Sequence, residues 1–315
     1  MGRYLLRRLV LALPTLFVIT VMVFLVVRAL PGDVVTRMLE GYAHRATEEA
    51  LRKELGLGRP AHVQYVEWMG RILTAGNFGK SLWTGQDILE ELGRRLPVTI
   101  ELAFLTILIS VILGIGVGLV SAIRQDTALD YVGRSVAITA LSVPYFALAV
   151  LVVVLPSIYF RWTPVWTYVT FSANPVENLK ILLMPAAVFG ITRAGPIMRI
   201  TRSALLEVLR QEYVRTAWAK GLRERAVILR HALRNALIPV LTLTGLQMPL
   251  YLGGSVIMES VFRLPGIGHF FFESLNRLDY PVIQSVNLIV AGMIVFLNLL
   301  IDLSYAALDP RIRYQ

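Results

Sequence analysis

The stretch Leu102–Ile123 reads LAFLTILISVILGIGVGLVSAI and decides the fold of this chain. It contains no charged side chain, and its apolar residues do not alternate with polar ones as in a half-buried strand. A helix needs about 20 apolar residues to cross the hydrocarbon core of a bilayer, where only the backbone can satisfy its own hydrogen-bonding groups. Residues 102–123 are therefore predicted to form a membrane-spanning helix.

Five further windows have the same character. Four are about as long and carry no charge, and the fifth qualifies if Arg193 is accommodated inside the protein. These windows are Leu9–Val27, Ser135–Phe160, Asn235–Met258, Tyr280–Ile301 and about Leu179–Met198. A soluble protein could not cover so many apolar helices. We therefore expect an all-α membrane protein with six transmembrane helices.

The composition agrees with this class. Of the 315 residues 56% are hydrophobic and 17% are charged, and the mean hydropathy is +0.64. A soluble domain of this size would need far more charge on its surface. The chain has no cysteine, which excludes disulfide bonds and cysteine-based metal or redox chemistry.

The net charge of +10 fits either nucleic-acid binding or the positive-inside rule, and its distribution decides between them. With the amino terminus in the cytoplasm, segments 1–8, 124–134, 199–234 and 309–315 hold sixteen Lys and Arg against six Asp and Glu. The opposite segment, 31–98, holds nine of each. We therefore expect a multi-pass protein of a bacterial or archaeal cytoplasmic membrane, with both termini in the cytoplasm and no nucleic-acid partner.

We divide the chain into an N-terminal anchor helix (1–30), an extracytoplasmic segment with short helices (31–98) and a five-helix core (99–315). Three arginines before the first window resemble the start of a signal peptide. However, the apolar run is too long, and no small-x-small cleavage site follows it. The first window is therefore predicted to be a retained anchor.

The extracytoplasmic segment shows two helix patterns and one loop. A helix is expected at Glu48–Leu55, with Thr47 as its N-cap, and an amphipathic helix at about Val63–Leu73. The loop Gly76–Ser81 resembles a phosphate-binding loop but lacks the first glycine of that motif. We expect no nucleotide site there.

The segment 199–235 lies between two predicted spans and carries nine Lys and Arg against three Glu. A short helix is expected from Glu212, stopped by Gly221, and a second over Glu224–Asn235. Four residues of this loop share an apolar face at helical spacing: Val214, Ala217, Trp218 and Leu222. Arg223, Arg230 and Arg234 share a basic face. Such a loop fits either an apolar knob with a basic rim or a solvated segment that binds lipid headgroups.

From this loop outward, the chain resembles the permease subunits of ABC importers. Their EAA loop has the core Glu-Ala-Ala, three residues, then Gly, and here Arg215-Thr216-Ala217 and Gly221 occupy these positions. Of the later Ile-x-Leu-Pro, only Leu233 is retained. The dipeptide/oligopeptide branch is much more similar, through Glu212-Tyr-Val-Arg-Thr-Ala-x-Ala-Lys-Gly-Leu222 and Arg230-His-Ala-Leu-Arg-Asn-Ala-Leu-Ile-Pro239.

Other segments resemble the same branch, in order along nearly the whole chain. They are Leu30-Pro-Gly-Asp33, Leu55-Gly-Leu with Pro60, Gln64-Tyr65, Gly79-Lys-Ser81, Leu96-Pro-Val-Thr-Ile-Glu-Leu102, Leu264-Pro-Gly-Ile-Gly268, and Asn298-Leu-Leu-Ile-Asp302 with Ala307-Leu-Asp-Pro-Arg311.

The resemblance implies a type I ABC importer permease fold with a cytoplasmic coupling helix, forming half of a pathway for di- or oligopeptides. The implied partners are a homologous second permease subunit, two cytoplasmic ABC ATPase subunits that bind ATP and Mg, an extracytoplasmic solute-binding protein and membrane lipid. It implies neither an enzymatic activity nor a cofactor or metal in this chain. Oligosaccharides, nickel chelates and glutathione-like compounds, carried by relatives of the branch, remain alternative solutes.

The resemblance also implies which residues carry the function. Contact with the ATPase is expected from nine residues of the loop: Glu212, Arg215, Thr216, Ala217, Ala219, Lys220, Gly221, Leu222 and Arg223. The glycine-rich connection formed by Leu264, Pro265, Gly266 and Gly268 is either a turn between helices or a contact with an external partner.

Charged residues inside a membrane usually pair or serve a function. Four of them are candidates for lining or gating the path: Glu101, Arg193, Glu259 and Asp302. For Asp302, pairing with a neighbouring helix is the alternative. Interruptions of the spans are expected at Pro144, Pro185, Pro196 and Pro249, and close helix packing at Gly114, Gly116 and Gly118.

Two other classes account for the sequence less well. An intramembrane serine hydrolase would need a histidine base, but all four histidines lie outside the predicted spans. An aspartyl protease would need two membrane aspartates, and only Asp302 qualifies. A standalone channel or secondary transporter is the other alternative, although no inverted repeat is apparent.

Overall fold

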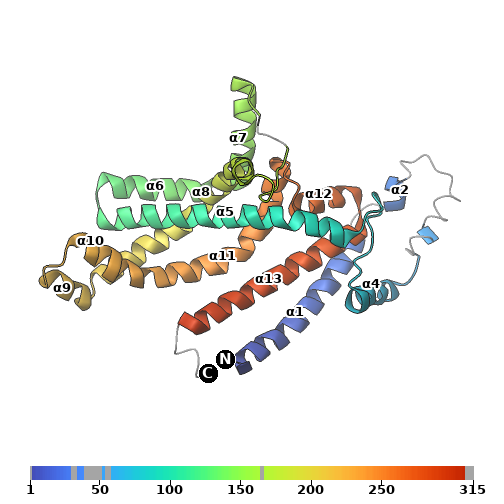
Figure 1. Cartoon of the computed structure of the whole chain (residues 1–315), viewed down its shortest axis with the longest axis horizontal. Helices are drawn as coiled ribbons and strands as arrows, with labels where there is room; N and C mark the ends of the chain where they lie inside the picture. Colours follow the sequence, from blue (N-terminus) through green and yellow to red (C-terminus); the bar gives the residue numbers. More distant parts are fainter. Residues whose placement is uncertain (1, 30–33, 39–51, 54–57, 164–166, 309–315) are drawn as a thin grey trace. The chain divides into compact units, whose positions relative to one another are not determined.

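Figure 1 shows the chain as a computed structural model, which describes residues 2–29, 34–38, 52–53, 58–163 and 167–308. Within these ranges the side chains of residues 2–9, 36–37 and 302–308 are not described. The predicted helix Glu48–Leu55 falls almost entirely outside the described residues. Apart from a single bridge between Lys80 and Asp87, the regular structure in these ranges is helical.

The chain forms two compact units, Met1–Pro97 with Pro265–Gln315, and Val98–Leu264. The helix α5 (Ile88–Ile123) belongs to both, and the boundary falls at Pro97. We describe each unit separately. The division into 1–30, 31–98 and 99–315 stays a prediction.

The first unit joins the two ends of the chain. It contains α1 (Gly2–Ala29), α2 (Val34–Met38), α4 (Ala61–Ala75), the start of α5, α12 (Ile267–Arg277) and α13 (Tyr280–Leu308). The long helices α1 and α13 pack along each other (Figure 1). A buried cluster that includes Ile88, Ile267 and Val282 holds α5, α12 and α13 together. The amphipathic helix predicted at Val63–Leu73 is confirmed as α4.

The loop after α4 is held by a buried carboxylate. The hydroxyl of Ser81 donates to Oδ2 of Asp279 at 2.6 Å, and the backbone N–H of Leu82 donates to Oδ1 at 3.2 Å. Ser81 Oγ also accepts the backbone N–H groups of Trp83 and Thr84. Burial raises the pKa of the Asp279 carboxyl. All these hydrogen bonds of Ser81 shape the loop. The sequence Gly79-Lys80-Ser81 therefore has a structural role.

The second unit is built around α8 (Pro175–Leu209). Against it pack α6 (Ala128–Ser142), α7 (Tyr145–Phe160) and α11 (Leu233–Val261). Three short pieces connect α8 to α11: α9 (Glu212–Ala219), α10 (Glu224–Ala226) and the π-helix η1 (Val227–Ala232). The most apolar window of α8 is 56% buried, the largest share among the candidate spans. This burial makes α8 the central helix of the unit.

The predicted span Ser135–Phe160 is not one helix. It breaks between α6 and α7, which are bent by 93° (Figure 1). Pro144 has no N–H to continue the helix and disfavours helical geometry at the preceding residue. Val143 is accordingly extended, with φ −90° and ψ 121°. The interruption predicted at Pro144 is therefore confirmed, and the window forms two helices. The described residues contain five helices that could span a membrane, and six if this bent pair counts as one span.

The other prolines expected to interrupt spans do not end their helices. Pro185 and Pro196 lie inside α8, and Pro249 lies inside α11. Neighbouring groups in a membrane helix commonly accommodate a proline in this way.

Glycines allow α5 and α8 to approach closely. A β-carbon on Gly114 would lie 2.6 Å from the side chain of Ile197, and one on Gly118 would lie 2.7 Å from Thr201. One on Gly190 of α8 would meet Ile109 at 2.8 Å. Gly116, in contrast, faces open space. Close packing is thus confirmed for Gly114 and Gly118, which are one turn apart, and is wrong for Gly116, which lies on another face.

Gly254 of α11 makes a similar contact with an aromatic ring. Phe189 is fully buried in the core of the unit, with its ring centroid 4.9 Å from that of Tyr145 and 6.1 Å from that of Tyr251. A β-carbon on Gly254 would lie 2.3 Å from Cζ of this ring. Because Phe189 is fully buried, a β-carbon at Gly254 would require the ring to push into other packed side chains.

We expect Gly254→Ala to lower the stability of the protein by about 1–3 kcal/mol, because the core is overpacked. Thermal unfolding in detergent measures the loss. Gly253→Ala is the matched control, since a β-carbon there meets nothing within 4 Å. If Gly254→Ala unfolds at the same temperature as Gly253→Ala, the tight contact with Phe189 is wrong.

A buried ion pair fastens α6 to α8. Asp130 is fully buried, and its two carboxylate oxygens accept Nε and Nη2 of Arg202 at 2.8 and 2.7 Å. It also accepts a hydrogen bond from Ser121 and the backbone N–H of Asp126. These four hydrogen bonds satisfy the buried carboxylate and fix the turn between α5 and α6.

We expect Asp130→Asn to cost about 2–3 kcal/mol of stability, below the ~3–5 kcal/mol of a fully buried pair, because the Arg202 side chain is 19% exposed. The unfolding temperature in detergent should fall accordingly. Asp126→Asn is the control, since Asp126 is exposed in the same turn and its positive φ suits asparagine. Equal unfolding temperatures for the two variants would contradict this assignment.

Candidate functional site

The helix α9 lies at the end of α8, where the chain turns back toward α11 (Figure 1). It ends in a reversal in which Leu222 N–H donates to the carbonyl of Ala217 and Gly221 N–H to that of Trp218. This pair of bonds needs a residue with positive φ, and Gly221 has φ +73°. The predicted helix and its glycine stop are confirmed.

The apolar residues of α9 are divided between two faces. Val214 is fully buried and Ala217 nearly so, and they form a small core with Val227 of η1. Val208 and Leu209 of α8 pack against the same core. Burial of these two residues fastens α9 to α8 and to η1. The prediction of one shared apolar face therefore holds for only half of the four apolar residues.

The other half of the apolar residues is exposed. Trp218 is 43% exposed and Leu222 40%, and Tyr213 is 43% exposed. Tyr213 is also held in place, since its hydroxyl accepts a hydrogen bond from Nδ2 of Asn235 at 2.6 Å. The result is a rigid helix that presents aromatic and aliphatic groups outward.

Most of the other residues predicted to contact an ATPase are exposed as well. Glu212 and Arg215 form an exposed ion pair at 2.8 Å, and the Thr216 hydroxyl donates to the Glu212 carbonyl. Ala219, Lys220 and Arg223 are exposed as well. Of the nine residues predicted to contact an ATPase, only Ala217 is buried.

The second predicted helix, Glu224–Asn235, is not a separate element. Residues 224–261 are helical throughout, with the π-helical segment η1 between α10 and α11. Arg230 and Arg234 lie one turn apart and line a shallow groove of about 450 Å³ with Leu229, Leu233 and Leu237. This continuity joins the loop directly to α11.

The candidate path residues make specific contacts. Glu101 accepts hydrogen bonds from the Tyr168 hydroxyl at 2.9 Å and from Nδ2 of Asn178 at 3.0 Å. Burial raises the pKa of the Tyr168 hydroxyl, and the hydrogen bond to Glu101 raises it further by a smaller amount. Glu101 thus holds the connection between α7 and α8 against α5.

Glu259 and Arg193 also contact neighbouring side chains. Glu259 is fully buried, and its Oε1 accepts a hydrogen bond from the Thr99 hydroxyl at 2.8 Å. The guanidinium of Arg193 lies 5.2 Å from the ring centroid of Phe189 and 5.6 Å from that of Tyr145. Its predicted accommodation inside the protein is therefore achieved partly by aromatic rings. The Asp302 side chain is outside the described residues.

The glycine-rich connection is mostly internal. Leu264 is buried in the core of its unit and donates its N–H to the Glu259 carbonyl at 2.9 Å. Gly266 precedes α12 as its N-cap, and Gly268 lies in the first turn of that helix. Both glycines are buried, and Pro265 is half-buried. Contact with an external partner stays a prediction.

Two pairs were missed by reasoning from the sequence: Asp130 with Arg202, and Ser81 with Asp279. The first two residues are 72 positions apart and the second two are 198 positions apart. Nothing in the local sequence pairs them. The only signal for Asp130 was its place in a short loop that also carries Arg124, Asp126 and Arg134. Among the described residues, no three His, Asp or Glu side chains gather as a metal site would require.

Comparison with known proteins places this geometry in a family. Residues 114–314 match the model of the binding-protein-dependent transport system inner membrane component, and residues 1–103 match the model of the N-terminal region of these membrane components.

Curated relatives match over nearly their full length. A probable peptide ABC transporter permease protein of Sinorhizobium fredii is 37% identical, with 100% of both chains covered. An oligopeptide transport system permease protein of Bacillus subtilis is 36% identical over 100% of both chains, and a glutathione transport system permease protein of Salmonella choleraesuis is 38% identical over 100% of both.

Solved structures agree at the level of the fold. A chain of the methionine ABC transporter has a TM-score of 0.56 at 16% identity, with 70% of this chain and 97% of that chain covered. An amino acid ABC transporter has a TM-score of 0.52 at 15% identity, with 71% and 94% covered. With the family models covering almost every residue, this chain belongs to the inner-membrane permease components of binding-protein-dependent ABC transport systems.

Proposed function

We propose that this permease forms half of a translocation path for di- or oligopeptides, which an external solute-binding protein delivers. A homologous permease subunit would supply the other half, and two ATPase subunits that bind ATP and Mg would drive transport. Relatives named for peptide, oligopeptide and dipeptide transport support the substrate class. The relative named for glutathione, itself a small peptide, makes short modified peptides the alternative.

The observation that carries this proposal is how α9 is built. Its buried residues fix it to the end of α8 and to η1, and its exposed residues form a compact aromatic and aliphatic surface. A short helix held on two sides transmits a push as rigid-body motion and does not absorb it. We therefore assign α9 as the coupling helix that docks on an ATPase subunit. This role places the loop and both termini in the cytoplasm, as the positive-inside rule also favours.

We assign the path residues by their contacts. Glu101 and Glu259 would act by holding helices at the edge of the path, since both carboxylates accept hydrogen bonds from neighbouring elements. Arg193 lies beside one aromatic ring of α7 and one of α8, and it would respond when α8 moves against α7.

The first test removes the exposed aromatic group of α9. Trp218→Ala should weaken assembly with the ATPase subunits by about 30-fold, because an interface tryptophan typically contributes ~2 kcal/mol or more. Co-purification of the ATPases and peptide uptake into vesicles measure the loss. Trp162→Ala is the matched control, since this tryptophan is 46% exposed and lies after α7. Unchanged assembly and uptake for Trp218→Ala would refute the coupling assignment.

The second test changes the reversal and leaves the exposed surface intact. Gly221→Val has space for its side chain, yet it forces a β-branched residue to φ +73°, which costs about 1–3 kcal/mol locally. We expect the subunit to insert and bind its ATPases, while ATP hydrolysis no longer drives uptake. The measurement is the ratio of peptide transported to ATP hydrolysed. Gly221→Asn, which tolerates this φ, should largely restore that ratio; equal ratios in the wild type and Gly221→Val would contradict the role of the reversal.

A further inference from the structure

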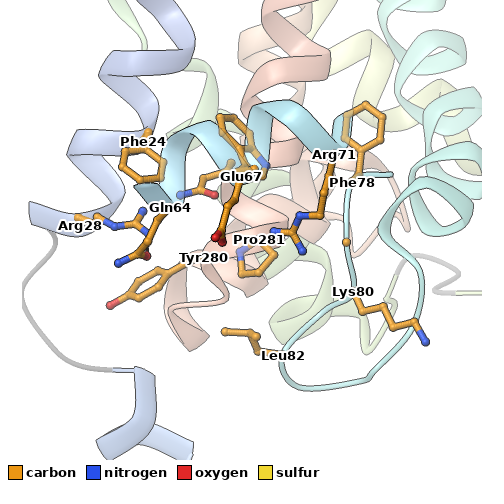
Figure 2. A pocket seen from close by; sticks show the side chains of 13 residues that line it. Phe24, Arg28, Gln64, Glu67, Arg71, Phe78, Lys80, Leu82, Tyr280 and Pro281 are labelled. Atoms are coloured by element: carbon orange, nitrogen blue, oxygen red, sulfur yellow. Dashed lines mark hydrogen bonds between the residues drawn. The ribbon is translucent and has the colours of Figure 1, made fainter. Parts of the chain in front are cut away.

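A cavity of about 290 Å³ lies within the unit that joins the chain ends (Figure 2). The last turn of α1, one side of α4, the loop 78–82 and the first turn of α13 enclose it. Its walls combine aromatic residues with cations. Neither the coupling helix nor the residues assigned to the path take part in it.

Three hydrogen-bond donors that line this cavity have no acceptor in the described structure. They are Nε1 of Trp68, Nε2 of Gln284 and Nη1 of Arg28. The side chains of Trp68 and Gln284 are each only 5% exposed. Buried donors are almost always satisfied, and leaving one unsatisfied is costly. Three of them around one cavity indicate that an acceptor group belongs there.

The charges around the cavity favour an anion. Arg28, Arg71 and Lys80 line it, together with one carboxylate, that of Glu67. Glu67 is already bound by Nη1 of Arg59 at 2.6 Å, so it neutralises little of this charge. In Figure 2, Arg28 and Arg71 lie on either side of Glu67, and the Lys80 ammonium points away. Because Glu67 lies between them, an anion would bind on the Arg28 side of the cavity, next to Trp68, since Arg28 and Trp68 both pack on Phe24.

Arg28 is held in a position to bind such a ligand. Its guanidinium lies 3.7 Å from the ring centroid of Phe24, and its Nη2 donates to Gln64 Oε1. These contacts fix the planar group and leave Nη1 for an acceptor.

The cavity lies at the ends of two candidate spans. Arg28 is in the last turn of the candidate span Val10–Ala29, and Tyr280 begins another candidate span. The lipid phosphates lie just beyond the hydrocarbon core, at the ends of such spans. In α4, Tyr65 and Trp68 contact Phe24, which resembles the aromatic belt found at membrane interfaces.

Exposed apolar residues continue from the cavity along α1. Leu13 and Phe17 lie on the same side of α1 as Phe24 and Arg28, and they are 67% and 60% exposed. Water would not favour this surface, whereas acyl chains would cover it. An anion with attached acyl chains fits both the donors and the surface around them.

We infer that this cavity binds the phosphate of a membrane phospholipid, through Trp68, Gln284 and Arg28, with the acyl chains along α1. The inference goes beyond the proposed transport function and does not depend on it.

The test uses native mass spectrometry of the purified full chain in detergent, titrated with phosphatidylglycerol. Gln284→Leu and Arg28→Met should each weaken binding about tenfold, because each removes one donor to the phosphate. Arg94→Met is the control, since Arg94 is exposed on the first turns of α5 in the same unit and does not line the cavity. Its lipid binding should equal that of the wild type.

Three further titrations identify the ligand. Diacylglycerol, which has no phosphate, should not distinguish the wild type from Gln284→Leu. Glycerol phosphate alone should bind at least tenfold more weakly than the lipid; equal binding would indicate a soluble phosphate and overturn the inference. A dialanine peptide that binds more tightly than phosphatidylglycerol would overturn it in favour of a substrate subsite.

The inference stays testable even if the variants of Gln284 and Arg28 fail to fold. Trp68→Phe, which keeps an aromatic ring beside Phe24 and removes only the Nε1 donor, tests the same site if the other variants fail to fold. If Trp68→Phe binds phosphatidylglycerol as tightly as Arg94→Met does, the cavity does not hold a phosphate. If every variant binds lipid like the wild type, the cavity holds only water. Either result overturns the inference, whatever the transport assays show.

Discussion

Close packing is the constraint on which the unit Val98–Leu264 depends. In hydrocarbon, burial of apolar surface does little to bring helices together, so they associate through contacts between their atoms. Here those contacts centre on α8, at positions where a glycine lets two helices approach. Gly114 and Gly118 of α5 lie on Ile197 and Thr201, and Gly254 of α11 lies on Phe189. A shift of even half an ångström at such contacts requires other atoms to move, so α5, α8 and α11 resist small relative motions.

Polar contacts then fix the ends of these helices. Asp130 joins the turn between α5 and α6 to α8 through Arg202, and Glu101 joins α5 to the connection before α8. Apolar packing is not directional and would tolerate several rotations of a helix. Charge-assisted hydrogen bonds have defined geometry, and so they select one arrangement. These hydrogen bonds also offset the cost of burying the carboxylates of Asp130 and Glu101.

The sequence was informative wherever one local rule decided the outcome. The length of the apolar windows predicted the spanning helices, and Gly221 predicted the end of α9, because bilayer thickness and left-handed backbone geometry leave few alternatives. Where two rules compete, the sequence was not enough. Pro144 predicted an interruption of the apolar window Ser135–Phe160, but nothing in the sequence predicted that the two halves would be bent by 93°. Val214 and Trp218 look equivalent on a helix, and only their neighbours bury one and expose the other. Long-range pairs such as Asp130 with Arg202 have no local signal at all.

The architecture of the loop limits how α9 can work. Because Val214 packs on residues from both α8 and η1, a force on α9 reaches the two helices together. α11 continues from η1 without interruption, so a displacement there acts along that whole helix. The tight contacts of α8 with α5 and α11 prevent the force from being absorbed locally. A coupling helix of this kind would therefore move α8 and α11 together, as one body.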